Sequence, residues 1–199
     1  MVAKPAQENG TPATYRDVEA APENMVAELV NGMLHLSPRP RLRHGNAHSA
    51  ILTDIRGGFG RRTQGGGWHI ITEPECHLEL DRVVLVPDIA GWRRERLPEL
   101  PDSHKMTLAP DWVCEVLSPS TQTRDYLVKL PQYLAHGVEW AWIVSVGARL
   151  VDVFRSETNE AGMRVWTQIA SAEGDVKVRL SPFDELELDL ADWWDSPRG

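Results

Sequence analysis

The segment Val83–Trp92, with the sequence VVLVPDIAGW, has the apolar character of a buried strand and carries a single carboxylate, Asp88. The segment Asp111–Ser118, with the sequence DWVCEVLS, places Glu115 in the middle of a similar run. An ionised carboxylate in a buried strand is costly unless a counter-charge pairs with it. Two such carboxylates in neighbouring strands therefore predict a shared cation, and they make Asp88 and Glu115 candidate metal ligands.

Oxygen ligands of this kind favour Mg²⁺ or Mn²⁺, which bind through one or two carboxylates together with water and phosphate oxygens. Such an ion lowers the pKa of a bound water and polarises a phosphoryl oxygen, as phosphodiester hydrolysis requires. Lys129, on a helix predicted over 124–135, is a candidate to stabilise the developing negative charge or to activate the water. The alternative is an ordinary helical ion pair with Asp125, four residues earlier, and the pattern leaves both interpretations open.

The chain has 199 residues, and the sequence predicts a disordered tail over residues 1–14 and a single domain over 15–195. No stretch approaches the roughly 18 apolar residues of a membrane span, and the N-terminus has no apolar signal-peptide core. We therefore expect a cytoplasmic protein with no membrane partner. The two cysteines lie in strand-like runs and are expected to be buried thiols, with no disulfide framework and no zinc site.

The net charge of −8 argues against broad non-specific binding of nucleic acid. Residues 39–105 differ, because they carry 11 basic and 9 acidic residues, a net charge of +2. Two arginine clusters flank the candidate site in this interpretation and are candidate contacts to backbone phosphates, namely Arg39, Arg41 and Arg43, then Arg93 and Arg94. A solvated surface is the alternative for each cluster.

Asn31-Gly32 between two alternating apolar segments predicts a β-hairpin over 25–36, because both residues tolerate a positive φ. A 3.6-residue apolar period predicts a helix over 44–56. Further strands are predicted, beginning with 68–72, 75–80, 83–91 and 112–117, followed beyond the helix over 124–135 by 139–146, 149–154, 163–170 and 175–180. This order predicts an α/β or α+β domain with a mixed sheet.

The chain resembles the PD-(D/E)xK nuclease superfamily and, more narrowly, the Uma-two family of restriction-endonuclease-like proteins. The resemblance covers residues 25–155 and rests on the order of short pieces: ELVNG at 28–32, SP at 37–38 with His44, VPD at 86–88, EVLSPST at 115–121, Asp125 with Lys129 and Tyr133, and GV at 137–138 with WIV at 142–144. It implies a four-stranded mixed core sheet flanked by helices, here with additional β-hairpins. One position departs from the superfamily pattern, because Leu117 stands where that pattern has lysine.

The resemblance implies that Asp88 and Glu115 are metal ligands and that Lys129 replaces the missing lysine from the following helix. It also implies Glu28 or His44 as an accessory residue near the metal, whereas a surface hairpin glutamate and a helix-capping histidine are the ordinary alternatives. We therefore expect a Mg²⁺-dependent endonuclease acting on DNA. The second hypothesis is a non-catalytic nucleic-acid-binding or assembly module on the same fold. Hairpins and tryptophans on strands are compatible with a homodimer.

Overall fold

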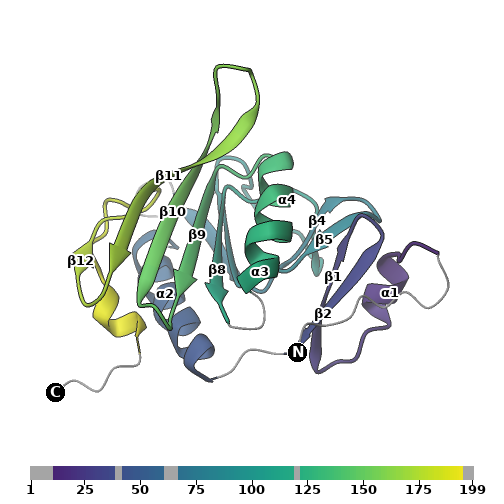
Figure 1. The fold of residues 1–199 in the computed structure, drawn as a ribbon, viewed down its shortest axis with the longest axis horizontal. Helices are drawn as coiled ribbons and strands as arrows, with labels where there is room; N and C mark the ends of the chain where they lie inside the picture. The colour runs from purple at the N-terminus through teal and green to yellow at the C-terminus, as the bar shows by residue number, and fades with distance from the viewer. Residues whose placement is uncertain (1–10, 39–41, 61–66, 119–121, 195–199) are drawn as a thin grey trace.

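Two β-sheets meet where the chain crosses between strand β5 (Val83–Leu85) and strand β6 (Ile89–Arg93) (Figure 1). The computed structural model describes residues 11–38, 42–60, 67–118 and 122–194. Most of the predicted 1–14 tail lies outside these residues, as do Arg39 and Arg41. Within them, Ala13 is buried and its amide donates a hydrogen bond to the carbonyl of Gly32, so the chain already packs against the domain at this residue.

The smaller sheet has the strand order β2-β1-β5-β4-β7. Its strands besides β5 are β1 (Met25–Val30), β2 (Met33–Pro38), β4 (Glu75–Glu79) and β7 (Lys105–Met106). The predicted hairpin is confirmed, since β1 pairs with β2 in antiparallel register across a turn in which Asn31 has a φ of 50° and Gly32 a φ of 77°. Helix α1 (Tyr15–Glu19) precedes this sheet, with a capping box between Thr14 and Asp17.

The larger sheet has six strands in the order β11-β10-β9-β8-β6-β3, with β8 and β9 parallel and the other neighbours antiparallel. Its other strands are β3 (Trp68–Thr72), β8 (Trp112–Leu117), β9 (Trp140–Ser145), β10 (Leu150–Thr158) and β11 (Arg164–Glu173). Strands β3, β6, β8 and β9 form the expected four-stranded mixed core, and β10 and β11 extend it. The α+β prediction with a mixed sheet is confirmed.

The predicted strand over 83–91 is wrong as a single element. Residues Val83–Leu85 pair with β1 and β4 in the smaller sheet, whereas Ile89–Arg93 pair with β3 and β8 in the larger one. Pro87 lies between them, and because proline has no N–H it cannot donate to a strand ladder. Asp88 therefore lies at the crossover rather than inside a strand.

Helices α2 and α4 cover opposite faces of the larger sheet (Figure 1). Helix α2 (Leu42–Phe59) is longer than the predicted 44–56, and its glycines do not interrupt it. The predicted helix over 124–135 is built from α3 (Gln122–Arg124), a π-helical turn η1 (Asp125–Lys129) and α4 (Leu130–Ala135). Pro131 offers no N–H to the preceding turn and clashes with an α-helical carbonyl, which accounts for the wider π geometry.

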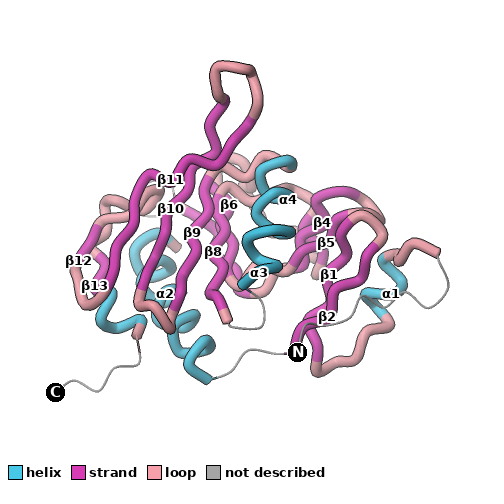
Figure 2. The backbone as a smooth tube through the Cα atoms, in the orientation of Figure 1, coloured by secondary structure: helices cyan, strands magenta, loops and turns pink. Residues whose placement is uncertain are grey.

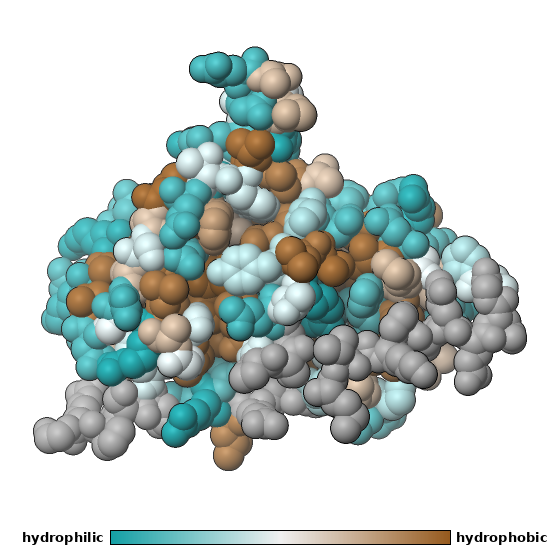
Figure 3. Space-filling view, in the orientation of Figure 1, coloured by the Kyte–Doolittle hydropathy of each residue, from teal (hydrophilic) through white to brown (hydrophobic). Residues whose placement is uncertain are grey.

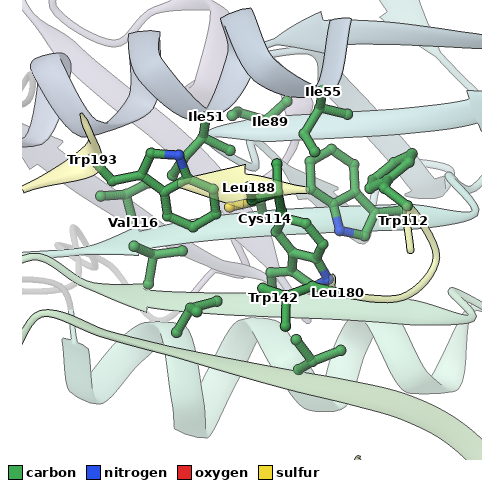
Figure 4. Close-up of a cluster of buried hydrophobic side chains, with 14 of the residues drawn as sticks. Ile51, Ile55, Ile89, Trp112, Cys114, Val116, Trp142, Leu180, Leu188 and Trp193 are labelled. Carbon is green, nitrogen blue, oxygen red and sulfur yellow. The ribbon is translucent and has the colours of Figure 1, made fainter. Parts of the chain in front are cut away.

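The core on the α2 side is rich in tryptophan. Figure 4 shows Ile51 and Ile55 of α2 packed over Trp112, Cys114 and Trp142 of the sheet. The C-terminal segment closes this side, where strands β12 (Lys177–Val178) and β13 (Leu188–Asp189) pair and the 3₁₀ helix η2 (Leu190–Trp193) follows. The centroid of the Phe183 ring lies 4.9–5.7 Å from the ring centroids of Phe59, Trp68, Trp112 and Trp142.

The hairpin of β10 and β11 extends beyond the rest of the larger sheet (Figure 2). Pairing with β9 ends at Arg155, whereas β10 and β11 stay paired as far as Thr158 and Arg164. Hydrophilic side chains are spread over this face of the molecule with apolar ones between them (Figure 3). None of the helices in the described ranges is both long enough and apolar enough to cross a bilayer.

Gly91 of β6 is closely surrounded, and its replacement tests the packing of the larger sheet next to the crossover that contains Asp88. A Cβ atom there would lie 3.0 Å from Ile70 Cδ1 and 3.1 Å from ring carbons of Trp68 and Trp112. We expect Gly91→Ala to lower the free energy of unfolding by about 1–3 kcal/mol through overpacking, as measured by urea denaturation. Gly147→Ala is the matched control, because no atom lies within 4 Å of its Cβ position. Equal stability of the two variants would contradict this packing.

Candidate active site

The strand register places Asp88 and Glu115 opposite one another. Strands β6 and β8 are antiparallel, and Ile89 pairs with Cys114 at the end of their ladder. Asp88 is the next residue outward from Ile89, and Glu115 is the next residue along β8 from Cys114. Both carboxylates line one pocket, together with Lys129. The two acids inferred from separate apolar runs are therefore neighbours in space.

Asp88 is held by groups from two elements. Its Oδ2 accepts a hydrogen bond of 2.7 Å from the backbone amide of Val116 on β8. The same oxygen lies 3.3 Å from Nε2 of His44, in the first turns of α2. The Asp88 side chain keeps 18% of its surface exposed, whereas its glutamate neighbour is nearly sealed. Asp88 is thus the acid of the pair that faces the pocket opening.

Glu115 is 2% exposed and has partners on both oxygens. Lys129 Nζ lies 2.7 Å from Oε1 and 2.8 Å from Oε2, and the hydroxyl of Tyr133 donates to Oε1 at 2.6 Å. Lys129 ends the π-helical turn and Tyr133 follows one turn later in α4, so the helix presents both side chains to β8. The lysine expected to replace the residue missing at position 117 therefore contacts Glu115 directly.

Glu28 of β1 continues this chain of charges. Its Oε1 lies 3.2 Å from Lys129 Nζ and accepts a hydrogen bond of 2.9 Å from the amide of Val86, and its Oε2 lies 3.0 Å from an Arg124 nitrogen. Arg124 also donates to the hydroxyl of Ser37 on β2. Cations and anions thus alternate from Arg124 through Glu28 and Lys129 to Glu115. Glu28 is 1% exposed, so its ion pair with Lys129 is buried. Through Lys129, which also pairs with Glu115, this ion pair links β1 of the smaller sheet to β8 of the larger one.

The pKa values reflect both the burial and the pairing of these groups. Burial alone would lower the pKa of Lys129, but Glu115 and Glu28 outweigh it and raise that pKa, so the ammonium is kept protonated. Burial would likewise raise the pKa of Glu28, yet Lys129 and Arg124 hold it below its usual value. Burial opposes the charged form of Asp88 and of His44, but their mutual contact lowers the pKa of Asp88 and raises that of His44.

Glu115 behaves differently, since burial raises its pKa to about 8 in spite of Lys129, and the neighbouring acids add to the shift. Asp125, Asp88 and Glu28 supply the repulsion. Burial is the largest cause of this shift, and a bound cation would oppose it because it would favour the ionised form of Glu115.

The pocket between these groups is small, with a volume of about 50 Å³. It has room for an ion with a few waters but not for a nucleotide. Asp88 and Glu115 offer hard oxygen donors, and each carboxylate oxygen has two lone pairs, so Glu115 can keep its hydrogen bonds and still face a cation. No three His, Cys, Asp or Glu side chains among the described residues form a metal-binding cluster, so water or phosphate oxygens would complete the coordination. The donor set fits one Mg²⁺ or Mn²⁺ ion on these terms.

The structure brings together the candidate site residues of the sequence analysis, namely Asp88, Glu115, Glu28, Lys129 and His44. It does not bring Arg93 and Arg94, two of the candidate phosphate-binding arginines, to this site. Arg43 is exposed beside His44. Arg93 lies at the other end of β6, five residues or about 16 Å from Asp88. Its guanidinium pairs with Glu139 at 2.8 Å and with Asp111 at 3.5 Å. Arg94 reaches His69 at 3.2 Å. The second arginine cluster therefore does not flank this pocket.

Sequence reasoning missed two residues of the network and left two others without a role. Arg124 was not singled out, nor was His48, whose Nε2 lies 2.8 Å from the backbone carbonyl oxygen of Asp88. Ser37 and Tyr133 appeared only as parts of the resemblance. Arg124 is the last residue of α3, and its position directly before Asp125 in the predicted helix over 124–135 was the available signal. For His48 the signal was its spacing of four residues from His44, which places both on one face of a helix.

Comparisons with known proteins show the family and the fold of the chain. The model of the Uma2 family, described as "Putative restriction endonuclease", matches residues 12–191. Among solved structures, the chain is similar to a protein from Anabaena variabilis ATCC 29413 described as a putative nuclease belonging to DUF820. The two share 22% sequence identity over 92% of this chain and 98% of the other, with a TM-score of 0.68, which shows a common fold. No curated protein matches the chain.

The buried ion pairs predict a large stability effect for Lys129→Met. This change leaves Glu28 and Glu115 buried without their shared cation, and we expect the free energy of unfolding to fall by about 3–5 kcal/mol. Lys177→Met is the matched control, because Lys177 lies 3.9 Å from Glu187 in an exposed pair. Urea denaturation of both variants measures the difference. Adding Glu115→Gln to Lys129→Met should restore part of the loss, and equal stability of the two single variants would contradict the network.

Proposed function

The chain belongs to the Uma2 family, whose description is "Putative restriction endonuclease", and we propose that it is a metal-dependent endonuclease that hydrolyses DNA phosphodiester bonds. The observation that carries the proposal is the convergence of Asp88, Glu115 and Lys129 on one pocket. The strand register sets the two acids opposite each other, and Lys129 lies 2.7 Å from Glu115. This convergence supports the proposal that Lys129 replaces the lysine that the superfamily pattern has at the position of Leu117.

In this proposal Asp88 and Glu115 hold Mg²⁺ or Mn²⁺. The bound ion would supply Lewis-acid polarisation of a phosphoryl oxygen and a water of lowered pKa. Asp88 is the more exposed of the two acids and would hold the ion on the side of the pocket that faces solvent. Glu115 lies deeper, where Lys129 and Tyr133 fix the orientation of its carboxylate.

Lys129 acts as a fixed positive charge rather than as a proton acceptor. Its raised pKa keeps the ammonium protonated, and an ammonium group has no lone pair with which to accept a proton. Its three N–H donors match three acceptors, namely Glu115, Glu28 and the carbonyl of Val86 at 3.0 Å. Lys129 lines the same pocket as Asp88, and in this proposal its charge would stabilise the negative charge of the transition state through its electric field rather than by a direct hydrogen bond.

Glu28 is a positioning residue in this account. Both of its oxygens are engaged by Lys129, Arg124 and the amide of Val86, and its side chain is sealed from solvent. His44 contacts Asp88 directly and helps to keep that carboxylate ionised. Arg43 is exposed beside His44 and is a candidate contact to a backbone phosphate. Cytoplasmic location and a homodimer stay predictions.

One observation favours the second candidate function, a non-catalytic nucleic-acid-binding or assembly module. Glu115 is fully paired by Lys129 and Tyr133, as it would be in a purely structural network. Such a module would have no need of a metal ion. Binding of Mn²⁺ by the purified protein therefore separates the two functions, since the module would not bind the ion at Asp88 and Glu115.

Cleavage of plasmid and single-stranded DNA by the purified protein tests the proposal. We expect cutting with Mg²⁺ or Mn²⁺ and none with EDTA. Asp88→Ala and Lys129→Ala should each reduce the cleavage rate by about 100-fold or more, because the first removes a ligand of the metal ion and the second removes a positive charge that stabilises the transition state. Asp102→Ala and Lys177→Ala are matched controls, as both residues are exposed and on other parts of the surface.

The controls decide how a loss of activity is interpreted. Cleavage by Asp88→Ala at the rate of Asp102→Ala would contradict the metal site. Cleavage by Lys129→Ala at the rate of Lys177→Ala would reduce Lys129 to a structural ion-pair partner. Folding of each variant is checked by its circular dichroism spectrum and melting temperature, because Lys129 also contributes to stability.

A further inference from the structure

The backbone carbonyl of Asp88 has partners of its own, separate from those of its carboxylate. It accepts a hydrogen bond of 3.0 Å from the amide of Glu73, just beyond β3. His48 Nε2 lies 2.8 Å from the same oxygen. A carbonyl oxygen only accepts hydrogen bonds, so His48 must carry its proton on Nε2 and donate it. Asp88 is thus restrained at its carbonyl as well as at its carboxylate.

Helix α2 supplies both histidines that contact Asp88. His44 and His48 are four residues apart and lie on the same side of the helix, above the crossover. The same helix is anchored in the core by Ala47 and Ile51, which are fully buried. A rigid element therefore places one imidazole on the carboxylate and the other on the backbone of a single residue.

The restraint at the carbonyl matters because Asp88 is outside the β6–β8 ladder. That ladder ends at Ile89, and Pro87 contributes no donor on the other side. Rotation about the Asp88 backbone would move its carboxylate relative to Glu115. The hydrogen bond from His48 to the carbonyl of Asp88 opposes that rotation. It therefore helps to keep the carboxylate of Asp88 opposite that of Glu115.

We propose that His48 is a positioning residue of the active site, which fixes the backbone of Asp88 so that its carboxylate and that of Glu115 meet the same cation. The proposal rests on the proposed function. Outer groups that orient metal ligands typically change metal affinity by about 10–100-fold when they are removed. His48 acts through Asp88 and does not touch the cation or the DNA.

Mn²⁺ binding to purified protein without DNA, measured by calorimetry, tests the proposal. We expect His48→Ala to weaken binding by about 10-fold. His48→Gln should bind within about twofold of the unchanged protein, because its amide can donate to the same carbonyl. Asn46→Ala, an exposed change on the same helix, is the matched control and should have no effect. All three variants should melt within a few degrees of one another, since His48 is only half-buried.

The outcomes separate this proposal from the proposed function. If Asp88→Ala abolishes Mn²⁺ binding while His48→Ala binds as well as Asn46→Ala, the role of His48 is wrong and the metal site stands. Binding by His48→Gln as weak as that of His48→Ala would also overturn it, because the donor would not be the operative group. If the unchanged protein binds no Mn²⁺, both proposals fail together.

A second measurement does not depend on the metal. Nitrogen NMR of protein labelled in histidine reports which ring nitrogen carries the proton in the neutral ring. We expect His48 to be protonated at Nε2, as donation to the Asp88 carbonyl requires. A His48 ring protonated at Nδ1 alone would overturn the proposal even if the variants bind Mn²⁺ weakly.

Discussion

The crossover Val86–Asp88 is the constraint on which the rest of the structure depends. The chain leaves one sheet at Leu85 and enters the other at Ile89, and the polar groups between them are satisfied by side chains. The Glu28 carboxylate accepts a hydrogen bond from the backbone amide of Val86, and Lys129 donates one to the backbone carbonyl of Val86. The carboxylate of Asp88 accepts a hydrogen bond from the backbone amide of Val116. The residues proposed for catalysis therefore also join the two sheets, which is why the site and the fold cannot be altered separately.

A buried chain of ion pairs is an expensive way to join two sheets. The desolvation of several charges often exceeds their mutual attraction, and well-packed apolar side chains of similar size can be equally stabilising. Burial is the main cause that raises the pKa of Glu115 to about 8, so its ionised carboxylate is costly in a purely structural role. A cation-binding role accounts for a carboxylate at this buried position, because a bound ion would stabilise its ionised form.

Much of this arrangement could be predicted from local patterns, and the rest depends on tertiary contacts. Asn31-Gly32 predicts its hairpin because the turn needs positive φ at both residues, and the apolar run around Glu115 predicts a buried central strand. The split at Pro87 could not be predicted, since an apolar run does not say which sheet each half joins. Arg93 and Arg94 are near Asp88 in sequence, yet β6 carries them away from it. The π turn Asp125–Lys129 shifts the helix face before Lys129, so an α-helical period counted from Arg124 does not place Lys129 on Glu115.

The central claim is that Asp88 and Glu115 bind one divalent cation. A crystal structure of the protein soaked with Mn²⁺, recorded at a wavelength where manganese scatters anomalously, tests it most directly. The account predicts an anomalous peak in the pocket within about 2.0–2.3 Å of an oxygen of each carboxylate, with Lys129 still beside Glu115. A pocket without a peak at saturating Mn²⁺, with Glu115 bound only to Lys129 and Tyr133, would contradict the account and favour the non-catalytic module.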